Sequence, residues 1–267
     1  MPADALALAL AAAFLHAAWN VLLRGSEDVA ARTVAVLCLS VLLFAPVAAL
    51  TWSVQAAAIP YIAASSVLEG VYFLLLIAAY RRRELSVVYP VARGGAPVLV
   101  LLGTAVVLGR HVSAAEVAGV LLVAVGVLLV RGVRRGAEGI AIGVAIAVFI
   151  ASYTLVDKEG LRHAAPIPYL ELVLVPCALA ALAWKPSAVR SQWSWSTLGA
   201  AAGSFGAYVL FLFALRLTAA PGVAAVRETS VVIAALFAGT FLRERVGPGR
   251  LAGAVAVACG VALIALS

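Results

Sequence analysis

Apolar residues follow one another along this chain in long runs, interrupted by charged clusters and by turns that contain proline or glycine. A membrane-spanning helix needs roughly 20 mostly apolar residues, which is close to the length of each run. Ten spanning helices are predicted, at residues 5–23, 31–51, 60–80, 86–108, 113–131, 139–156, 167–184, 196–215, 220–242 and 246–266. The connections between them are too short for a soluble domain, so we predict an all-α integral membrane protein.

The two halves of the sequence repeat each other at an offset of 134 residues. Residues 87–131 align with 221–265 without a gap. The matches that carry most weight are Arg93 with Arg227, Gly119 with Gly253 and Gly126 with Gly260. We therefore predict two five-helix units, residues 1–133 and 134–267. Because five is odd, the second unit enters the membrane from the opposite side, which gives the inverted repeat typical of secondary transporters.

Composition agrees with a membrane protein and argues against several other classes. Hydrophobic residues make up 65% of the 267 residues and charged residues only 12%, whereas soluble domains are about 25% charged. The net charge of +7 does not indicate nucleic-acid binding, because the basic residues form short clusters between apolar runs. We find no metal-ligand spacing among the three cysteines and no HExxH, GxSxG or Walker motif. We therefore expect neither a metal nor a cofactor.

The basic residues also predict an orientation. With ten spans, thirteen lysines and arginines fall on one side of the membrane, and four fall on the other, at Arg110, Lys158, Arg162 and Arg216. The positive-inside rule places the richer side in the cytoplasm and hence both termini outside. We expect a multi-pass protein of the cytoplasmic membrane.

Four ionisable side chains lie well inside the predicted spans, at Glu69, Arg93, Arg227 and Glu228. A central arginine costs about 2.5–3.5 kcal/mol on insertion scales, so such residues mark functional sites by default. The inverted repeat brings the two arginines toward the centre from opposite leaflets. There they either anchor an anionic group or pair internally with glutamates. For Arg227 the adjacent glutamate favours internal pairing.

Further candidates surround a central site. Glu69 would bind a cation, pair with Arg93, or take up a proton that couples transport. Trp19 and Asn20 share one face of the first span with His16; Asn20 alternatively forms an interhelical hydrogen bond, and a core histidine is the simpler interpretation of His16. For the aromatic walls of the site we predict Tyr72, Tyr89 and Tyr153, with Tyr208 as a weaker candidate.

Backbone features indicate which helices move and which pack. Pro90 and Pro97 remove backbone hydrogen bonds on either side of Arg93. We therefore predict a gating or coupling role for these prolines, together with Glu69 and Glu228. The ninth span begins at a proline, where proline is tolerated. The paired glycines of the fifth and tenth spans predict tight packing surfaces or a dimer face.

Two tandem five-helix units with HAAWNVLLR at residues 16–24 and VVYPVARGGAP at residues 87–97 resemble the EamA-type carriers of the drug/metabolite transporter superfamily. The segments AGVLLVAVGVLLV (118–130) and AGAVAVACGVALIAL (252–266) fit the same pattern. The resemblance implies a ten-helix, basket-like fold around a central cavity, and transport of small organic metabolites without ATP. It also implies cytoplasmic termini, which is opposite to the orientation that the charges predict.

We predict a secondary active transporter that moves an amino acid-like zwitterion or an organic anion by alternating access. An organic cation or drug exporter is the alternative if Glu69 and the aromatic residues define the site. A passive channel or scramblase is a further alternative. An intramembrane enzyme is disfavoured because the sequence lacks the HExxH and GxSxG motifs. The expected partners are the small-molecule substrate and the lipid bilayer, with the chain acting as a monomer or homodimer and without nucleic acid.

Overall fold

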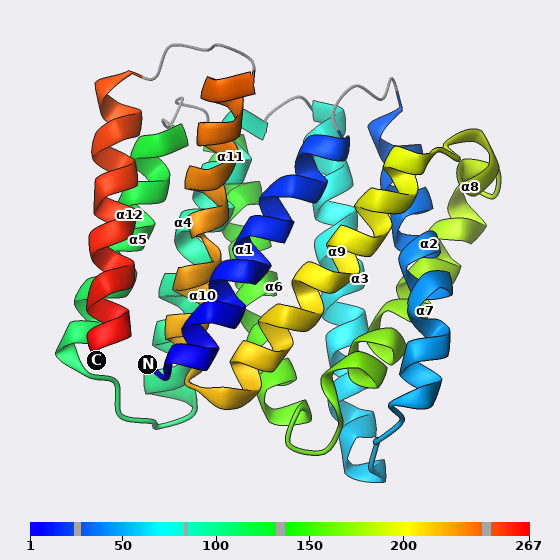
Figure 1. Ribbon diagram of the computed structural model, residues 1–267, viewed down its shortest axis with the longest axis horizontal. Coiled ribbons are helices and arrows are strands. Elements are labelled where there is room, and N and C mark those ends of the chain that lie inside the picture. Colours follow the sequence, from blue (N-terminus) through cyan, green and yellow to red (C-terminus); the bar gives the residue numbers. More distant parts are fainter. Residues whose placement is uncertain (24–27, 83–84, 132–136, 242–246) are drawn as a thin grey trace.

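The computed structural model describes residues 1–23, 28–82, 85–131, 137–241 and 247–267 (Figure 1). These ranges form an almost entirely helical bundle. Its main helices are α1 (Ala3–Leu23), α2 (Val29–Leu50), α3 (Ile59–Arg82), α4 (Leu85–Leu102), α5 (Ala114–Arg131), α6 (Ala137–Gly160), α7 (Pro166–Trp184), α9 (Trp195–Leu217), α10 (Ala220–Arg227), α11 (Thr229–Phe241) and α12 (Pro248–Leu266). Short elements are η1 (Ala56–Ala58), the π-helical η2 (Gly103–Val107) and α8 (Ala188–Ser191).

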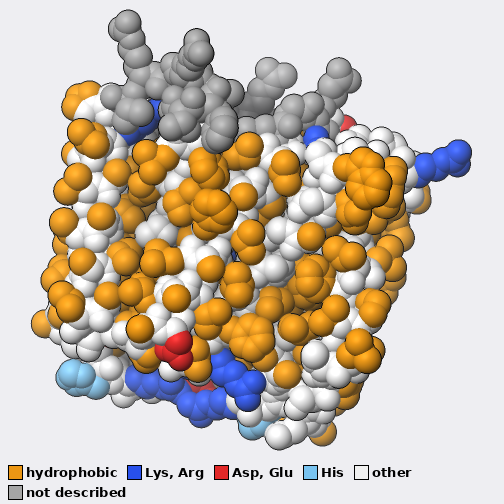
Figure 2. All heavy atoms as spheres, viewed as in Figure 1, with side chains coloured by type: hydrophobic (Ala, Val, Ile, Leu, Met, Phe, Trp, Pro, Cys, Tyr) orange, Lys and Arg blue, Asp and Glu red, His pale blue; other side chains and the backbone are white. Residues whose placement is uncertain are grey.

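The predicted fold class is confirmed. Among the described residues, nine segments are long and apolar enough to cross a membrane, and Ala114–Val130 is a shorter apolar helix. Apolar side chains cover most of the face of the molecule seen in Figure 2, and charged side chains gather along its lower edge. Such a surface suits a bilayer, because in a helix the backbone polar groups are satisfied internally.

The two ends of the bundle are distinguished by which helices end there. We call the end at which α1 and α3 finish the upper face, and the end that holds both termini the lower face (Figure 1). On the upper face Asp28 caps α2 by accepting a hydrogen bond from the Ala31 N–H at 2.8 Å. The Lys185 ammonium donates to the same carboxylate at 2.6 Å. This hydrogen bond lowers the pKa of Asp28 and ties α2 to the end of α7.

The sixth span is longer than the sequence predicted. We placed its end at residue 156, before a run of charged residues, but α6 continues to Gly160. The charges do not end the helix because they find partners inside the protein. Lys158 Nζ donates to the carbonyl oxygens of Leu215 at 2.6 Å and Thr218 at 2.9 Å, at the end of α9. The extension brings Asp157 into the membrane-spanning part of the bundle.

The fourth and ninth spans also differ from expectation. α4 is continuous through Pro90 and Pro97 and passes into the π-helical turn η2. The ninth span is instead interrupted, with Glu228 lying between α10 and α11. The Glu228 N–H bonds to the Ala225 carbonyl at 3.0 Å, which tightens the last turn of α10. The gating role predicted for the two prolines stays a prediction.

The glycines of α5 and α12 pack against each other within the chain. A Cβ atom on Gly126 would lie 2.7 Å from the Gly253 carbonyl oxygen, and one on Gly119 would lie 2.8 Å from that of Gly260. The tight packing surface predicted for these helices is confirmed. Since each glycine surface is covered by the other, these surfaces are not available as a dimer face.

The packing of helices in pairs also repeats at the 134-residue offset. α1 packs on α9, and the equivalent helices α6 and α3 pack on each other. The two pairs stand on either side of the centre of the bundle, and this arrangement positions the site.

Candidate functional site

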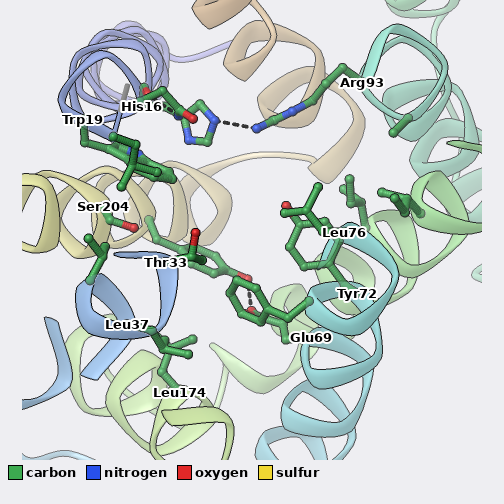
Figure 3. Close-up of a pocket in the computed structure, with 18 of the residues that line it drawn as sticks. His16, Trp19, Thr33, Leu37, Glu69, Tyr72, Leu76, Arg93, Leu174 and Ser204 are labelled. Atoms are coloured by element: carbon green, nitrogen blue, oxygen red, sulfur yellow. Dashed lines mark hydrogen bonds between the residues drawn. The ribbon is translucent and has the colours of Figure 1, made fainter. Parts of the chain in front are cut away.

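A cavity of about 140 Å³ lies in the centre of the bundle, between the α1–α9 pair and the α3–α6 pair (Figure 3). α2, α4, α7 and α10 also contribute side chains to it. Its lining reaches Leu23 at the end of α1 and Thr33 and Val88 near the starts of α2 and α4, all toward the upper face. Glu69 lies at the opposite, inner end. The cavity therefore extends from the upper face toward the membrane centre.

All eight residues predicted to bind substrate line this cavity: Trp19, Asn20, Glu69, Tyr72, Tyr89, Arg93, Tyr153 and Arg227. The spacing on α1, the repeat offset and the rule for intramembrane charges thus bring together residues from five helices. That they bind substrate remains a prediction. Pro90, Pro97 and Glu228, predicted to act in gating, do not belong to the lining.

Arg93 forms an ion pair that joins the two halves of the chain. Its Nη1 atom lies 3.1 Å from Glu228 Oε1, and both side chains are buried. Its Nη2 atom contacts His16 Nε2 (Figure 3). A guanidinium only donates hydrogen bonds, so His16 accepts with Nε2 and carries its hydrogen on Nδ1. His16 is therefore a neutral, buried and hydrogen-bonded histidine, as the simpler interpretation expected, and it also lines the cavity.

Arg227 occupies the equivalent position but has different surroundings. Its guanidinium carbon lies 4.5 Å from the centre of the Phe211 ring and 5.4 Å from that of Tyr208. Among the described residues, no carboxylate pairs with it and none forms a hydrogen bond to its side chain. Internal pairing was expected for this arginine because Glu228 follows it. That expectation is wrong, since neighbours on a helix point about 100° apart and Glu228 turns toward Arg93.

The α1 residues contribute an aromatic wall with an available donor. The Trp19 ring packs edge-to-face on His16, with centroids 5.3 Å apart. Trp19 Nε1 is buried and has no hydrogen-bond partner in the described structure. The Asn20 amide donates to the His16 carbonyl of its own helix at 2.7 Å. The alternative role of Asn20 as an interhelical hydrogen bond is therefore not what the structure contains.

Glu69 does not pair with Arg93. It contacts the Tyr208 hydroxyl, which also lies 3.0 Å from Asp157 Oδ2. Asp157 Oδ1 accepts hydrogen bonds from the hydroxyls of Ser65 at 2.6 Å and Tyr169 at 2.9 Å. Two buried carboxyl groups are thus connected through one phenol below the cavity.

The lower face is closed by contacts between loops. Val54 and Ala164 form an antiparallel bridge, flanked by backbone hydrogen bonds of 2.9 Å from Gln55 to His163 and 2.8 Å from Ala165 to Ser53. Next to this bridge, Glu159 pairs with Arg110 at 2.6 Å and with Arg162 at 3.1 Å. Together with the contact between Lys158 and the end of α9, these bonds separate the cavity from the lower face.

Sequence reasoning missed several residues of the site. Tyr208 was only a weak candidate, and Asp157 was assigned to a loop because charged neighbours follow it. Ser65 and Tyr169 were not considered, since a hydroxyl among apolar residues gives no signal by itself. For Asp157 a usable signal existed: a helix of typical spanning length that starts near residue 139 continues past 156.

Comparisons with known proteins support the assignment of the fold. Residues 137–266 match the model of the EamA-like transporter family. A solved structure described only as "Crystal structure of protein" superposes with a TM-score of 0.79 at 14% sequence identity, covering 100% of this chain and 98% of that one. At that identity the likeness shows the fold alone. None of the curated proteins matches the sequence.

The match and the bundle of apolar helices lead to one family, whose members are membrane transporters. The chain is a multi-pass membrane protein whose second half, residues 137–266, belongs to the EamA-like transporter family, part of the drug/metabolite transporter superfamily.

Proposed function

We propose that the protein is a secondary transporter that carries a small zwitterionic or anionic metabolite, of the amino acid type, across the cytoplasmic membrane by alternating access. The observation that carries this proposal is the state of Arg227. Its guanidinium stands in the cavity wall on aromatic rings and has no carboxylate partner among the described residues. A guanidinium that lacks a carboxylate partner gains most from a bidentate partner such as a carboxylate.

A second donor supports the same ligand chemistry. Trp19 Nε1 is buried, unpaired in the described structure and part of the residue set that lines the cavity. An unsatisfied buried N–H costs about 1–3 kcal/mol, so a ligand that accepts this hydrogen recovers that cost. Both available groups are donors, which favours a ligand that accepts hydrogen bonds over an organic cation.

The size of the cavity favours a metabolite over a drug-sized molecule. A cavity of about 140 Å³ is comparable to the engineered ~150 Å³ cavity that takes up benzene. Pockets for drug-sized ligands are about 300–1,000 Å³. An amino acid with a small or medium side chain suits a cavity of about 140 Å³.

The difference between the two faces of the bundle supports a carrier over a channel. The lining reaches the upper face, whereas paired loops and ion pairs close the lower face. A channel would need a path open at both faces at the same time, whereas a carrier alternates between them.

Ligand-induced thermal stabilisation of the purified protein tests the proposal. Glycine, L-alanine, L-leucine and L-phenylalanine are each compared with their methyl esters, which keep the ammonium group but lack the carboxylate. A ligand at 100 times its Kd stabilises the folded state by about 2.7 kcal/mol. We expect the acids, and not the esters, to raise Tm, and the Arg227→Gln variant to lose this response.

The matched control is Arg216→Gln, which removes an exposed arginine outside the cavity and should keep the response. Equal stabilisation by acids and esters, or by tetraalkylammonium ions, would favour the organic cation alternative and refute the carboxylate anchor. Counterflow in proteoliposomes then separates carrier from channel, because only a carrier shows stimulation by substrate on the opposite side.

A further inference from the structure

We propose that Glu69 and Asp157 share one proton through Tyr208, and that this proton binds together with the substrate carboxylate, so that transport is proton symport. The inference rests on the proposed function for its substrate. The proton site itself follows from the hydrogen-bond geometry below the cavity.

Asp157 has the environment of an ionised carboxylate. Its Oδ1 atom accepts hydrogen bonds from Ser65 and Tyr169, at 2.6 and 2.9 Å. The Tyr208 hydroxyl lies 3.0 Å from Oδ2. Three hydroxyl donors around one buried carboxyl group stabilise its charged form.

Glu69 has the environment of a neutral acid. Among the described residues, the only hydrogen-bond partner of its carboxyl group is the Tyr208 hydroxyl. A phenol carries a single hydrogen, which it donates to one carboxyl group at a time. If this hydrogen points to Asp157, the contact with Glu69 requires a hydrogen from the Glu69 carboxyl group. The relay then runs from the Glu69 O–H to Tyr208 Oη, and from the Tyr208 O–H to Asp157 Oδ2.

Every neighbouring helix contributes to the electrostatic surroundings of Glu69. The ionisable groups that act on it are Asp157 and Tyr153 from α6, Tyr169 and Cys177 from α7, Tyr208 from α9 and Arg227 from α10. Tyr72 is on the same helix. On α4, Arg93 is already paired with Glu228. With one proton on the carboxyl pair, the charges of Arg93, Glu228, Arg227 and Asp157 sum to zero.

Arg227 links the proton to the substrate. It acts electrostatically on both Glu69 and Asp157. A second negative charge on Glu69 would attract this guanidinium and repel an incoming carboxylate. Protonation of Glu69 removes that competition, so a proton and a carboxylate favour each other's binding. By linkage the coupling is reciprocal, and binding of the substrate must raise proton occupancy.

The relay also has a suitable position. Glu69 is part of the cavity lining, whereas Ser65 lies one helical turn nearer the start of α3 and Tyr169 near the start of α7. Both helices start at the lower face (Figure 1). The hydroxyl groups around Asp157 therefore lie between the cavity and the closed face.

Infrared spectroscopy tests the proton site without any substrate. In wild-type protein at neutral pH we expect a C=O band of a protonated carboxyl group that is lost in Glu69→Gln. The control is Glu171→Gln, which alters another buried carboxyl group, one outside the cavity, and should leave the Glu69 band in place. A wild-type spectrum that is unchanged by Glu69→Gln in this region would overturn the proton site.

Proton uptake tests the coupling. When L-alanine or L-leucine is added to the detergent-solubilised protein in weakly buffered solution, at a pH where the Glu69 band of the free protein is half lost, we expect the medium to become alkaline. In Glu69→Gln the amino acid should cause no pH change. Tyr208→Phe keeps the ring under Arg227 but removes the bridging hydroxyl, and should lose most of the uptake. Should Glu69→Gln prove unstable, Tyr208→Phe alone decides the outcome.

The outcomes separate the two proposals. If neither acid binds, the proposed substrate class fails, while the infrared band still decides the proton site. Binding that leaves the pH unchanged in wild-type protein, or that requires Na⁺, would overturn proton symport and leave the carboxylate anchor intact.

Discussion

Two arginines at equivalent positions of the repeat have opposite roles in the structure. Arg93 is neutralised by Glu228 and held by His16, whereas Arg227 rests on aromatic rings and faces the cavity. The residue that follows each arginine accounts for the difference. Gly94 follows Arg93 and Glu228 follows Arg227, so only one carboxylate is present for the two guanidinium groups.

The first prediction concerns the buried ion pair. Arg93→Gln leaves the Glu228 carboxylate buried without a counter-charge, and breaking such a pair costs about 3–5 kcal/mol. We expect a marked fall in Tm, measured by thermal unfolding in detergent. The double variant Arg93→Gln with Glu228→Gln should regain most of the lost stability. Equal Tm values for the single and double variants would show that the unpaired Glu228 carboxylate is not the cause of the lost stability.

At the residue scale, the sequence predicted which residues line the cavity better than it predicted which side chains pair with each other. Arg93, Arg227 and Glu69 line the cavity as expected, because a charge inside a span has to face the protein interior. Their partners were not predictable. Whether Glu228 reaches Arg93 or Arg227 depends on the rotation of α10 relative to α4, and a sequence does not specify that rotation.

At the scale of helices, the described glycines come closest to the backbone of another helix at the α5–α12 contact. Gly253→Ala places a methyl group 2.6 Å from the Gly126 carbonyl oxygen. Backbone cannot yield as a flexible side chain does, and overpacking typically costs about 1–3 kcal/mol. We expect Tm to fall in Gly253→Ala and in Gly126→Ala.

Gly249→Ala, on the same helix, is the matched control. Its Cβ would lie 3.9 Å from the nearest atom, and alanine is favoured over glycine inside a helix by roughly 0.5–1 kcal/mol. Tm should stay constant or rise in this variant. A fall as large as that of Gly253→Ala would show that close packing is not the cause.

A third prediction concerns the contact that holds α6 against α9. Lys158→Met keeps the side-chain length but removes the donor to the Leu215 and Thr218 carbonyls. We expect the lower face to open more often. A cysteine at the buried position Leu161, in a variant without the native cysteines, should then react several-fold faster with a membrane-impermeant maleimide added on that side. Lys185→Met at the upper face should leave the rate unchanged.

Helix number and type were predictable at this scale, because the length of an apolar run is set by the bilayer. Helix ends were less so. The end of α6 and the interruption at Glu228 depend on partners in other helices, such as the carbonyl groups that bind Lys158. Charged residues end a span only where they would otherwise face lipid.

At the scale of the whole molecule, the repeat offset predicted a symmetric arrangement that recurs in the helix packing. The division into units 1–133 and 134–267 stays a prediction. The closure of the lower face was not predictable from the sequence. Both halves contain the same helices, and the closure depends on contacts between the loops at the ends of those helices.

The fourth prediction concerns orientation. The helix ends that flank the connections with thirteen basic residues lie at the upper face, and those that flank the connections with four lie at the lower face. We expect the upper face in the cytoplasm and both termini outside. Alkaline phosphatase fused to the C-terminus should be active, and green fluorescent protein at the same place should be dark. The reverse result would support the cytoplasmic termini that the family resemblance implies.

The unequal residues at positions 94 and 228 have a consequence for how cargo travels. In a perfectly symmetric inverted repeat, the site would look the same from both sides of the membrane. A bound molecule with two different ends would then have no preferred orientation. A Cβ on Gly94 would meet the Ala124 carbonyl oxygen at 3.2 Å, so a second glutamate at this position would crowd the backbone of α5. The close packing at Gly94 thus favours a difference between the two halves. On the proposed function, we expect the cargo to keep its carboxylate toward Arg227 throughout the cycle while the protein changes around it.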